Sequence, residues 1–281
     1  MRIVHSTRQM RSIAKNLKSK GIRIGFVPTM GALHDGHLSL IEKARKENEI
    51  VVVSIFVNPA QFSPREDFKK YPRSLKMDLR LCKKEGVDFI FYPKAADMYP
   101  QGYKTFVSVE TLSGYLCGKS RPGHFRGVTT VVLKLFNIVQ PDIAYFGQKD
   151  TQQAIIIKKM VSDLNIPVKI KVMPIVREKG GLAMSSRNAY LNKPRRKDAL
   201  VLYAALLLGR RLIKKGVSSA SRIIKEMKEL IKTKRNAKID YICIVDPESL
   251  RPQERIKKGC LIALAVWIGK TRLIDNIIVR G

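Results

Sequence analysis

Two histidines stand three residues apart in the segment PTMGALHDGH, between an apolar run and an amphipathic one. At the start of a helix, side chains three residues apart are neighbours, so His34 and His37 should project from one face. The amino end of a helix favours phosphate, because it offers unpaired N–H groups and the positive end of the macrodipole. Gly36, which has no side chain, lets a flat nucleotide approach the backbone. A pair of histidines at this spacing is more often a surface or metal-binding feature, but only four histidines occur in the chain, so two in one turn favour a phosphate site.

Gln61 is the second candidate, in the segment SIFVNPAQF at the end of an apolar run. A carboxamide at the carboxyl end of a strand can bond a hydroxyl or a carboxylate without adding charge. Asn58 and Pro59 are typical turn residues, and the turn alone would account for them. We therefore expect Gln61 to hold a small polar group of a substrate.

The segment AYFGQKDTQQ repeats this arrangement after another apolar run. It places Lys149 and Asp150 in a loop and Gln153 one turn into the helix that follows. A solvated ion pair is the simpler interpretation of Lys149 and Asp150. Their place at the end of a strand nevertheless favours a site.

The segment GLAMSSRN contains two adjacent hydroxyls followed by an arginine. Arg187 would grip two phosphate oxygens, while Ser185 and Ser186 would each donate one hydrogen bond. The segment lies between two predicted domains, so we expect it to close over a nucleotide.

Short apolar runs alternate with amphipathic stretches up to residue 176, which predicts βα units and a parallel sheet. The expected fold class is α/β, with a Rossmann-like, doubly wound sheet whose ligands bind outside the carboxyl ends of the strands. The segment GKSRPGHFRG is predicted to be a loop. The expected strands are residues 22–27, 50–57, 87–91, 143–146 and 168–176, and the expected helices are residues 36–48, 74–85, a segment ending at 139, and 151–164.

After about residue 177 the pattern changes to Leu- and Lys-rich stretches followed by strand-like runs. These predict a smaller α+β domain with helices at 195–215 and 218–232 and strands at 239–245, 261–267 and 272–279. Residues 1–176 are therefore expected to form the nucleotide- and substrate-binding domain. Residues 177–281 are expected to act as its lid.

The charge balance is unusual, because 54 Lys and Arg against 23 Asp and Glu give a net charge of +31. Such an excess attracts ATP, acidic metabolites and RNA alike. An RNA-binding module would explain the charge but not the histidine, glutamine and Ser-Ser-Arg segments. The cations are also spread along the chain and are not interleaved with aromatic residues, so no specific nucleic acid is expected.

Targeting and cross-linking signals are weak. The apolar runs are far shorter than the ~20 residues that span a bilayer, and the N-terminal segment lacks the apolar core of a signal peptide. The four cysteines are scattered without a Cys-x-x-Cys pair, so neither zinc nor a disulfide framework is indicated. We expect a cytoplasmic protein without a membrane partner.

Six segments, in this order and spacing, resemble the pantothenate synthetase (pantoate–β-alanine ligase) family across nearly the whole chain: PTMGALHDGH, SIFVNPAQF, YPRS, GHFRGVTTVVLKLFNIVQPD, FGQKDTQQ and VREKGGLAMSSRN. His-x-Gly-His alone is similar to the signature of the wider nucleotidyltransferase superfamily that includes class I aminoacyl-tRNA synthetases. The combination of segments is far more specific than that signature.

The resemblance implies ATP-dependent condensation of pantoate with β-alanine through a pantoyl adenylate, with release of AMP and pyrophosphate. It also implies Mg²⁺ with the ATP, and a homodimer. It places Pro28, Thr29, Met30, Gln61 and Gln153 around pantoate. It places Met30, His34, Gly36, His37, Gly147, Lys149, Asp150, Val176, Met184, Ser185, Ser186 and Arg187 around ATP, with His34, His37, Lys149 and Arg187 as the catalytic groups. The segment after YPRS keeps Asp78 as a candidate Mg²⁺ ligand, but it has Lys76 and Met77 where relatives are more acidic, which argues against a protein ligand for Mg²⁺ there.

These residue types suit the implied reaction. The carboxylate of pantoate must attack the α-phosphate, so neutral Gln61 and Gln153 can orient it without quenching it as an arginine would. The gem-dimethyl group needs an apolar wall, for which Met30, Phe56 and Phe146 are candidates. Proximity and electrostatic stabilisation can carry both steps without a covalent enzyme nucleophile.

One alternative within the same superfamily is an adenylyltransferase that stops at nucleotidyl transfer. Gln61 together with Gln153 argues against it, because two carboxamides suit a small hydroxy acid and have no obvious role with a nucleotide substrate.

Overall fold

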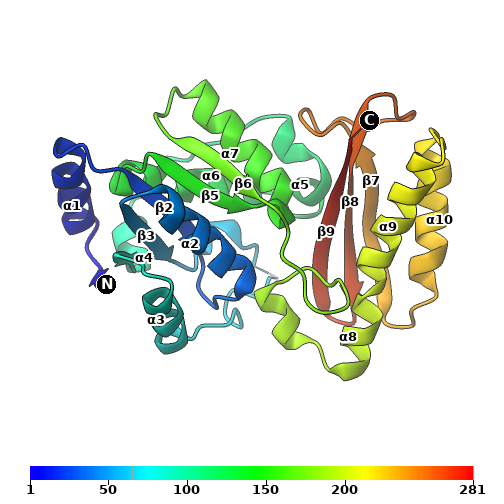
Figure 1. The fold of residues 1–281 in the computed structure, drawn as a ribbon, viewed down its shortest axis with the longest axis horizontal. Coiled ribbons are helices and arrows are strands. Elements are labelled where there is room, and N and C mark those ends of the chain that lie inside the picture. Colours follow the sequence, from blue (N-terminus) through cyan, green and yellow to red (C-terminus); the bar gives the residue numbers. More distant parts are fainter. Residues whose placement is uncertain (65, 281) are drawn as a thin grey trace. The chain divides into compact units, whose positions relative to one another are not determined.

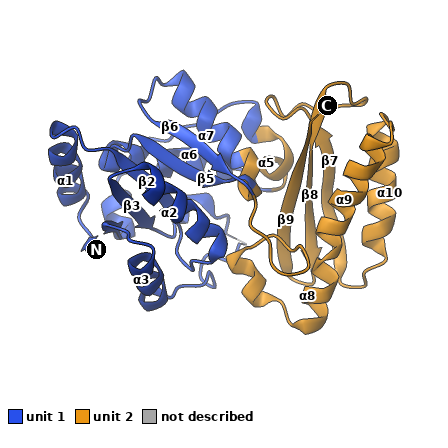
Figure 2. Cartoon of the chain, viewed as in Figure 1, with its two compact units in different colours: residues 1–113, 121–148, 153–174 blue, residues 114–120, 149–152, 175–281 orange. Residues whose placement is uncertain are grey.

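The computed structural model describes residues 1–64 and 66–280, and these divide into two compact units (Figure 2). The first unit consists of Met1–Ser113, Arg121–Gln148 and Gln153–Pro174. The second consists of Gly114–Ser120, Lys149–Gln152 and the chain from Ile175 onward. Lys149 and Asp150 thus group with the C-terminal part of the chain, although they precede the boundary near Val176 that the sequence suggests.

The first unit is built on a sheet that, within the described residues, has six strands in the order β1-β4-β3-β2-β5-β6 (Figure 1). Every neighbouring pair of these strands is parallel. The strands are β1 (Arg2–Val4), β2 (Ile24–Thr29), β3 (Ile50–Ile55), β4 (Phe89–Phe91), β5 (Ile143–Gly147) and β6 (Lys169–Met173).

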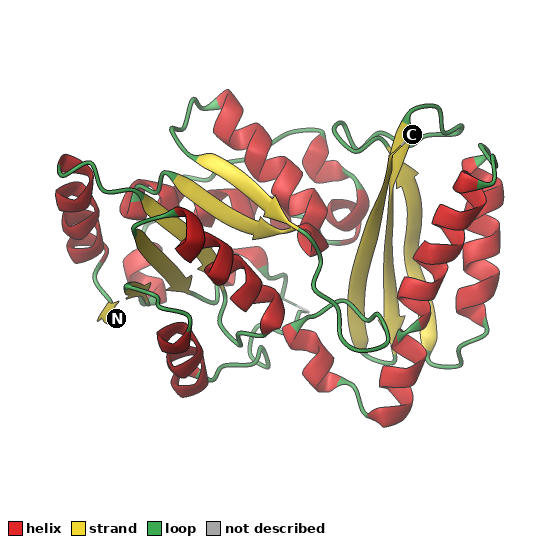
Figure 3. Cartoon of the chain, in the orientation of Figure 1, coloured by secondary structure: helices red, strands yellow, loops and turns green. Residues whose placement is uncertain are grey.

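Helices cover both faces of this sheet, as Figure 3 shows. Phe26 and Val27 are neighbours in β2, so their side chains point to opposite faces. The ring of Phe26 contacts the ring of Phe136 in α6, with 6.4 Å between the centroids. Val27 packs in the same buried cluster as Ile41 of α2. The helices of this unit are α1 (Thr7–Ser19), α2 (Asp35–Glu47), α3 (Leu75–Lys84), α4 (Ala95–Met98), α6 (His124–Val139) and α7 (Thr151–Asp163), of which the first two residues of α7 belong to the second unit.

The strand order reverses between β2 and β5. From β2 the chain moves outward through β3 and β4, and it then returns to place β5 on the other side of β2. In open parallel sheets, ligands bind at the carboxyl ends of the strands where the order reverses. The segment that carries His34 follows β2, and Gly147 ends β5. The fold therefore brings two of the predicted segments to this switch point.

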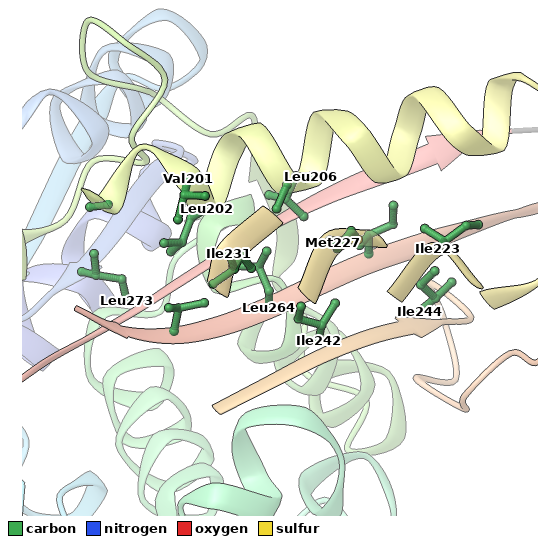
Figure 4. Close-up of a cluster of buried hydrophobic side chains, with 14 of the residues drawn as sticks. Val201, Leu202, Leu206, Ile223, Met227, Ile231, Ile242, Ile244, Leu264 and Leu273 are labelled. Atoms are coloured by element: carbon green, nitrogen blue, oxygen red, sulfur yellow. The ribbon is translucent and has the colours of Figure 1, made fainter. Parts of the chain in front are cut away.

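The second unit contains an antiparallel sheet in the order β7-β8-β9, with strands Ala237–Val245, Gly259–Ile268 and Thr271–Arg280. Helices α9 (Val201–Lys214) and α10 (Ala220–Lys232) pack on one face of it. Figure 4 shows Leu206 of α9 and Met227 of α10 above Leu264 of β8, in an apolar core that shields the sheet from water. The unit also contains α5 (Leu116–Ser120) and α8 (Lys193–Ala199). A parallel α/β sheet with a smaller α+β unit confirms the predicted fold class.

The N-terminal segment, to which no element was assigned from the sequence, forms β1 and α1, and Ser6 caps the helix by accepting a hydrogen bond from Gln9 N. Two local expectations need correction. The single helix expected at 195–215 is interrupted at Leu200, which separates α8 from α9. The loop expected at 118–127 includes the end of α5 and the first turn of α6. Within the described residues, no helix has the length and apolar character needed to cross a membrane.

Candidate active site

The two histidines of PTMGALHDGH lie side by side at the amino end of α2. Their ring centroids are 4.1 Å apart, with 35° between the ring planes. His34 is the N-cap of the helix, and its Nδ1 accepts a hydrogen bond from Gly36 N at 3.2 Å. Because Nδ1 accepts, a neutral His34 carries its proton on Nε2. His34 can therefore donate to an anion while it caps the helix.

The loop before these histidines is held in an unusual backbone shape. Gly31 and Ala32 both have positive φ angles, 78° and 50°. The hydroxyl of Thr29 donates to Ser54 O at 2.7 Å and accepts from Gly31 N at 3.1 Å. Thr29 therefore shapes the loop between β2 and α2.

Asp78 of α3 is the second support of this loop. Its side chain is buried, and its two oxygens accept hydrogen bonds from Ala32 N at 3.0 Å and Leu33 N at 2.8 Å. Burial raises the pKa of Asp78, although the two backbone hydrogen bonds oppose that shift. In the part of the chain that the structure describes, no group of three or more His, Cys, Asp or Glu side chains could hold a metal ion. Asp78 thus anchors this loop, and its role as a Mg²⁺ ligand stays a prediction.

Gln61 lies at the end of a short 3₁₀ helix, Pro59–Gln61, and is brought against Met30. Its Nε2 is 3.1 Å from Met30 Sδ, and its Oε1 accepts from Asn58 Nδ2 at 3.1 Å. A thioether is a weak acceptor, so a hydroxyl or carboxylate oxygen would be a stronger partner for the Gln61 amide. Gln153, in the first turn of α7, belongs to the same unit and is half-buried.

The predicted apolar wall also falls within the first unit. Phe56 directly follows β3, and Phe146 lies in β5 before Gly147. Both rings are buried. Pro28 lies next to Thr29 in β2 and is half-buried.

Asn58 is a residue whose importance the sequence did not reveal. Beyond capping the turn, its Nδ2 donates to Gly127 O at 3.1 Å and its Oδ1 accepts from Tyr99 O–H at 2.8 Å. The Asn-Pro pair predicted a turn, and a turn is present. The contacts with Tyr99 and Gly127 come from distant parts of the chain, so no local pattern could have indicated them.

Helix α6 holds the backbone around Gln61. An added Cβ at Gly127 would lie 2.2 Å from Ala60 O, so only glycine permits this approach. His124 Nδ1 is 2.8 Å from Gln61 O, and His124 Nε2 is 2.9 Å from Arg121 Nη1. An arginine can only donate, so Nε2 accepts and Nδ1–H donates to the Gln61 carbonyl.

Arg121 is itself held by a carboxylate. Its Nε and Nη2 bond the two oxygens of Glu66 at 2.5 and 3.0 Å. The bonds with Arg121 keep the pKa of Glu66 below its usual value, although burial acts in the opposite direction. The paired Arg121 in turn fixes the ring of His124.

Lys149 belongs to the second unit, together with Asp150. Its ammonium is 3.4 Å from Asp150 Oδ2, and its side chain is 21% exposed, so it remains within reach of a ligand. The carbonyl of Lys149 accepts a hydrogen bond from Asn276 Nδ2 at 3.0 Å.

The residues before the Ser-Ser-Arg motif also lie in the second unit and fold as a tight antiparallel turn, after which Ser185 caps a 3₁₀ helix, Ser186–Tyr190, that contains Arg187. Met184 N donates to Val176 O at 3.0 Å, which closes the turn. Gly180 and Gly181 have φ angles of 102° and 99°, which side-chain-bearing residues rarely adopt. The structure brings together, in this segment, the predicted ATP residues Val176, Met184, Ser185, Ser186 and Arg187, and the Oγ of Ser185 accepts from Arg187 N at 3.3 Å.

Comparisons with known proteins show what this chain is similar to. The model of the family described as pantoate-beta-alanine ligase matches residues 2–278. The pantothenate synthetase of Thermosipho melanesiensis is 56% identical over 281 residues, which covers 100% of both chains. That of Caldicellulosiruptor saccharolyticus is 55% identical over 280 residues, again with 100% of both chains covered.

Two solved structures are also similar. The pantothenate synthetase of Thermus thermophilus has a TM-score of 0.93 at 44% identity, with 100% of both chains covered. The pantoate-beta-alanine ligase of Francisella tularensis, solved in complex with beta-gamma ATP and beta-alanine, has a TM-score of 0.83 at 40% identity, with 99% of this chain and 97% of that chain covered. A family model that matches almost the entire sequence, relatives with more than half of their residues identical and a shared fold lead to one conclusion: the chain belongs to the pantoate–β-alanine ligase family.

Proposed function

We propose that this chain condenses pantoate with β-alanine to form pantothenate, and that ATP drives the reaction through a pantoyl adenylate. The observation that carries the proposal is the Gln61 carboxamide, whose oxygen is engaged by Asn58 and whose nitrogen contacts a thioether. Such a donor suits an uncharged contact to a carboxylate that must remain nucleophilic. Membership of the ligase family and the paired histidines at the start of α2 support the same reaction.

In the adenylation step, the pantoate carboxylate attacks the α-phosphate of ATP and pyrophosphate leaves. Gln61 and Gln153 orient the carboxylate, and Met30, Phe56 and Phe146 contact the gem-dimethyl group. His34 donates from Nε2 to a phosphate oxygen, since its Nδ1 is used in capping α2. His37, in the same turn, supports the developing negative charge.

The second unit supplies the cationic groups. Lys149 stabilises charge on the phosphoryl oxygens, and Arg187 with Ser185 and Ser186 binds the phosphates of ATP. The free amine of β-alanine then attacks the carbonyl of the adenylate and expels AMP. Neither step uses a covalent bond to the enzyme.

Mg²⁺ and a homodimer complete the proposal. Because Asp78 is occupied by Ala32 N and Leu33 N, we propose that Mg²⁺ enters with the phosphates of ATP and not on a carboxylate of α3. The homodimer would be recognised by a mass in solution of twice 31.9 kDa.

Isotope exchange tests the function directly. With Mg²⁺, the purified protein should exchange labelled pyrophosphate into ATP only when pantoate is present, and β-alanine should not be needed. Added β-alanine should then release AMP and pantothenate in equal amounts. Exchange that proceeds without pantoate would reject pantoate as the acid that is activated.

A further inference from the structure

Two segments assigned to ATP in the second unit are both bonded to strand β9. The residues concerned are Asp275 and Asn276, which are neighbours in the strand and are 3% and 2% exposed. Neighbouring residues in a strand point to opposite faces of the sheet. One short piece of β9 can therefore hold a different segment on each of its faces.

Asp275 holds the turn that leads directly into the Ser-Ser-Arg motif. Its two oxygens accept from Arg177 Nη1 at 2.6 Å and Nη2 at 3.0 Å. The same Nη1 donates to Gly181 O at 2.9 Å, and the guanidinium lies 3.9 Å from the ring centroid of Tyr203. Arg177 thus ties both strands of the turn to β9.

Asn276 holds the other segment. Its Nδ2 donates to the carbonyl oxygen of Lys149 at 3.0 Å, which fixes the backbone from which the Lys149 ammonium extends. Burial raises the pKa of Asp275, and the charges of Arg177 and Lys149 oppose this shift.

Stability does not explain why polar residues occupy these positions. Buried carboxylates and amides are costly to desolvate, and replacing a buried ion pair with well-packed apolar residues is often neutral or stabilising. The alternatives are available in the same strand, where Leu273 and Val279 are buried apolar side chains. The polar pair instead joins two segments that each carry a proposed phosphate contact.

We propose that Asp275 and Asn276 are positioning residues for ATP, Asn276 through Lys149 and Asp275 through the turn that presents Arg187. Neither residue contacts the substrate in this mechanism. The inference rests on the proposed function and deepens it, since it assigns the support of the groups proposed to bind ATP.

A double-mutant cycle tests the route through Lys149. Calorimetric titration with a non-hydrolysable ATP analogue and Mg²⁺ would compare the parent protein with Asn276→Ala, Lys149→Ala and the double variant. Loss of one hydrogen bond should weaken binding by about fivefold to tenfold in the parent background. In the Lys149→Ala background, Asn276→Ala should have almost no further effect, because residues that act through one another are non-additive. Equal losses in both backgrounds would overturn the proposal for Asn276.

The same design separates the role proposed for Asp275 from the role proposed for Asn276. Asp275→Asn should weaken binding of the analogue in the Lys149→Ala background and should lose its effect in the Arg187→Ala background. An effect that persists with Arg187→Ala would overturn the assignment of Asp275.

Controls distinguish positioning from general damage. Ile278→Ala changes an exposed residue on the same strand and the same face as Asn276, and it should bind the analogue like the parent. If Asn276→Ala fails to fold, Asn276→Ser provides a second, polar variant that is too short to reach Lys149 O. In folded variants the kcat for pantoate-dependent exchange should fall while the KM for pantoate stays unchanged. Absence of exchange in the parent protein would reject the proposed function, whereas the binding cycle would still decide the role of Asn276.

Discussion

Asn58 donates a hydrogen bond to Gln61 Oε1 across 3.1 Å, and this bond fixes the orientation of the Gln61 carboxamide. The nitrogen end then faces Met30 Sδ, a partner that an oxygen ligand readily replaces. Without Asn58, the carboxamide could rotate by half a turn and present its oxygen to the substrate. A carboxylate would then meet an acceptor where it needs a donor.

Asn58→Ala should therefore raise the KM for pantoate by about tenfold, which corresponds to about 1.4 kcal/mol, while the KM for ATP changes little. Steady-state kinetics with each substrate varied in turn would measure the split. Tyr99→Phe is a matched control, because it removes a contact to Asn58 Oδ1 and leaves the bond to Gln61 intact. Parallel increases in both KM values would contradict the assignment.

Gly127→Ala should destabilise the protein by about 1 to 3 kcal/mol, as overpacking of a buried contact usually does. The added methyl group would lie 2.2 Å from Ala60 O, and a backbone oxygen cannot rotate away as a side chain can. Gly114→Ala is the control, since an added Cβ there meets nothing within 4 Å. Urea unfolding would measure the stability, and a shift in the KM for pantoate would report displacement of Gln61. Equal stability of both variants would show that α6 can move aside.

Asp78→Ala should lower kcat without changing the requirement for Mg²⁺. The change leaves Ala32 N and Leu33 N without an acceptor, at a cost of about 1 to 3 kcal/mol for each buried group. Asp78→Asn is the matched variant, because its amide retains one acceptor and turns a donor toward the other N–H. Exchange rates measured against Mg²⁺ concentration would give the midpoint of activation. A large shift of that midpoint in a variant that is as stable as the parent would instead indicate that Asp78 is a metal ligand.

Glu47 should make the protein sensitive to acid. Lys171 and the hydroxyl of Tyr145 bond its two oxygens and lower the pKa of Glu47 from 4.5 to about 2. A lowered pKa stabilises the folded state above the unfolded value, and this contribution disappears as the pH falls from 4.5 to about 2. Glu47→Gln removes the contribution. The difference in unfolding free energy between parent and variant should therefore shrink over that pH range, whereas a constant difference would exclude the linkage.

The sequence predicted the elements whose periodicity is strong. Buried parallel strands such as Ile50–Ile55 are continuous apolar runs, and α2 places Leu40, Ile41 and Ala44 on one face. The sequence failed at α1, because that helix buries only Met10 and Ala14 and presents charge elsewhere. It also failed at Leu200, where α9 follows α8 directly without a glycine or proline between them.

The candidate site likewise contains residues that the sequence could predict and residues that it could not. His34, Gln61 and Lys149 stand at the ends of strands, where local pattern and family resemblance both mark them. Asp78 supports the loop before His34, and Asn276 supports the backbone of Lys149, through contacts between distant parts of the chain. Asn58 bonds Gln61 within one turn, but Asn58 is itself held by distant Gly127. Asn58 resembles any turn residue, and Asn276 resembles a polar interruption of a strand. Their roles become visible only when tertiary contacts are known.

Strand β9 has a consequence for the synthesis of the protein. A ribosome translates Lys149 and the turn at Arg177 long before it reaches Asp275 and Asn276. A nascent chain that stops short of β9 lacks the acceptor for Arg177 and the donor for the Lys149 carbonyl. The supports of both segments that are proposed to contact phosphate are thus translated together and after the segments themselves, so neither support is available before β9 has been made.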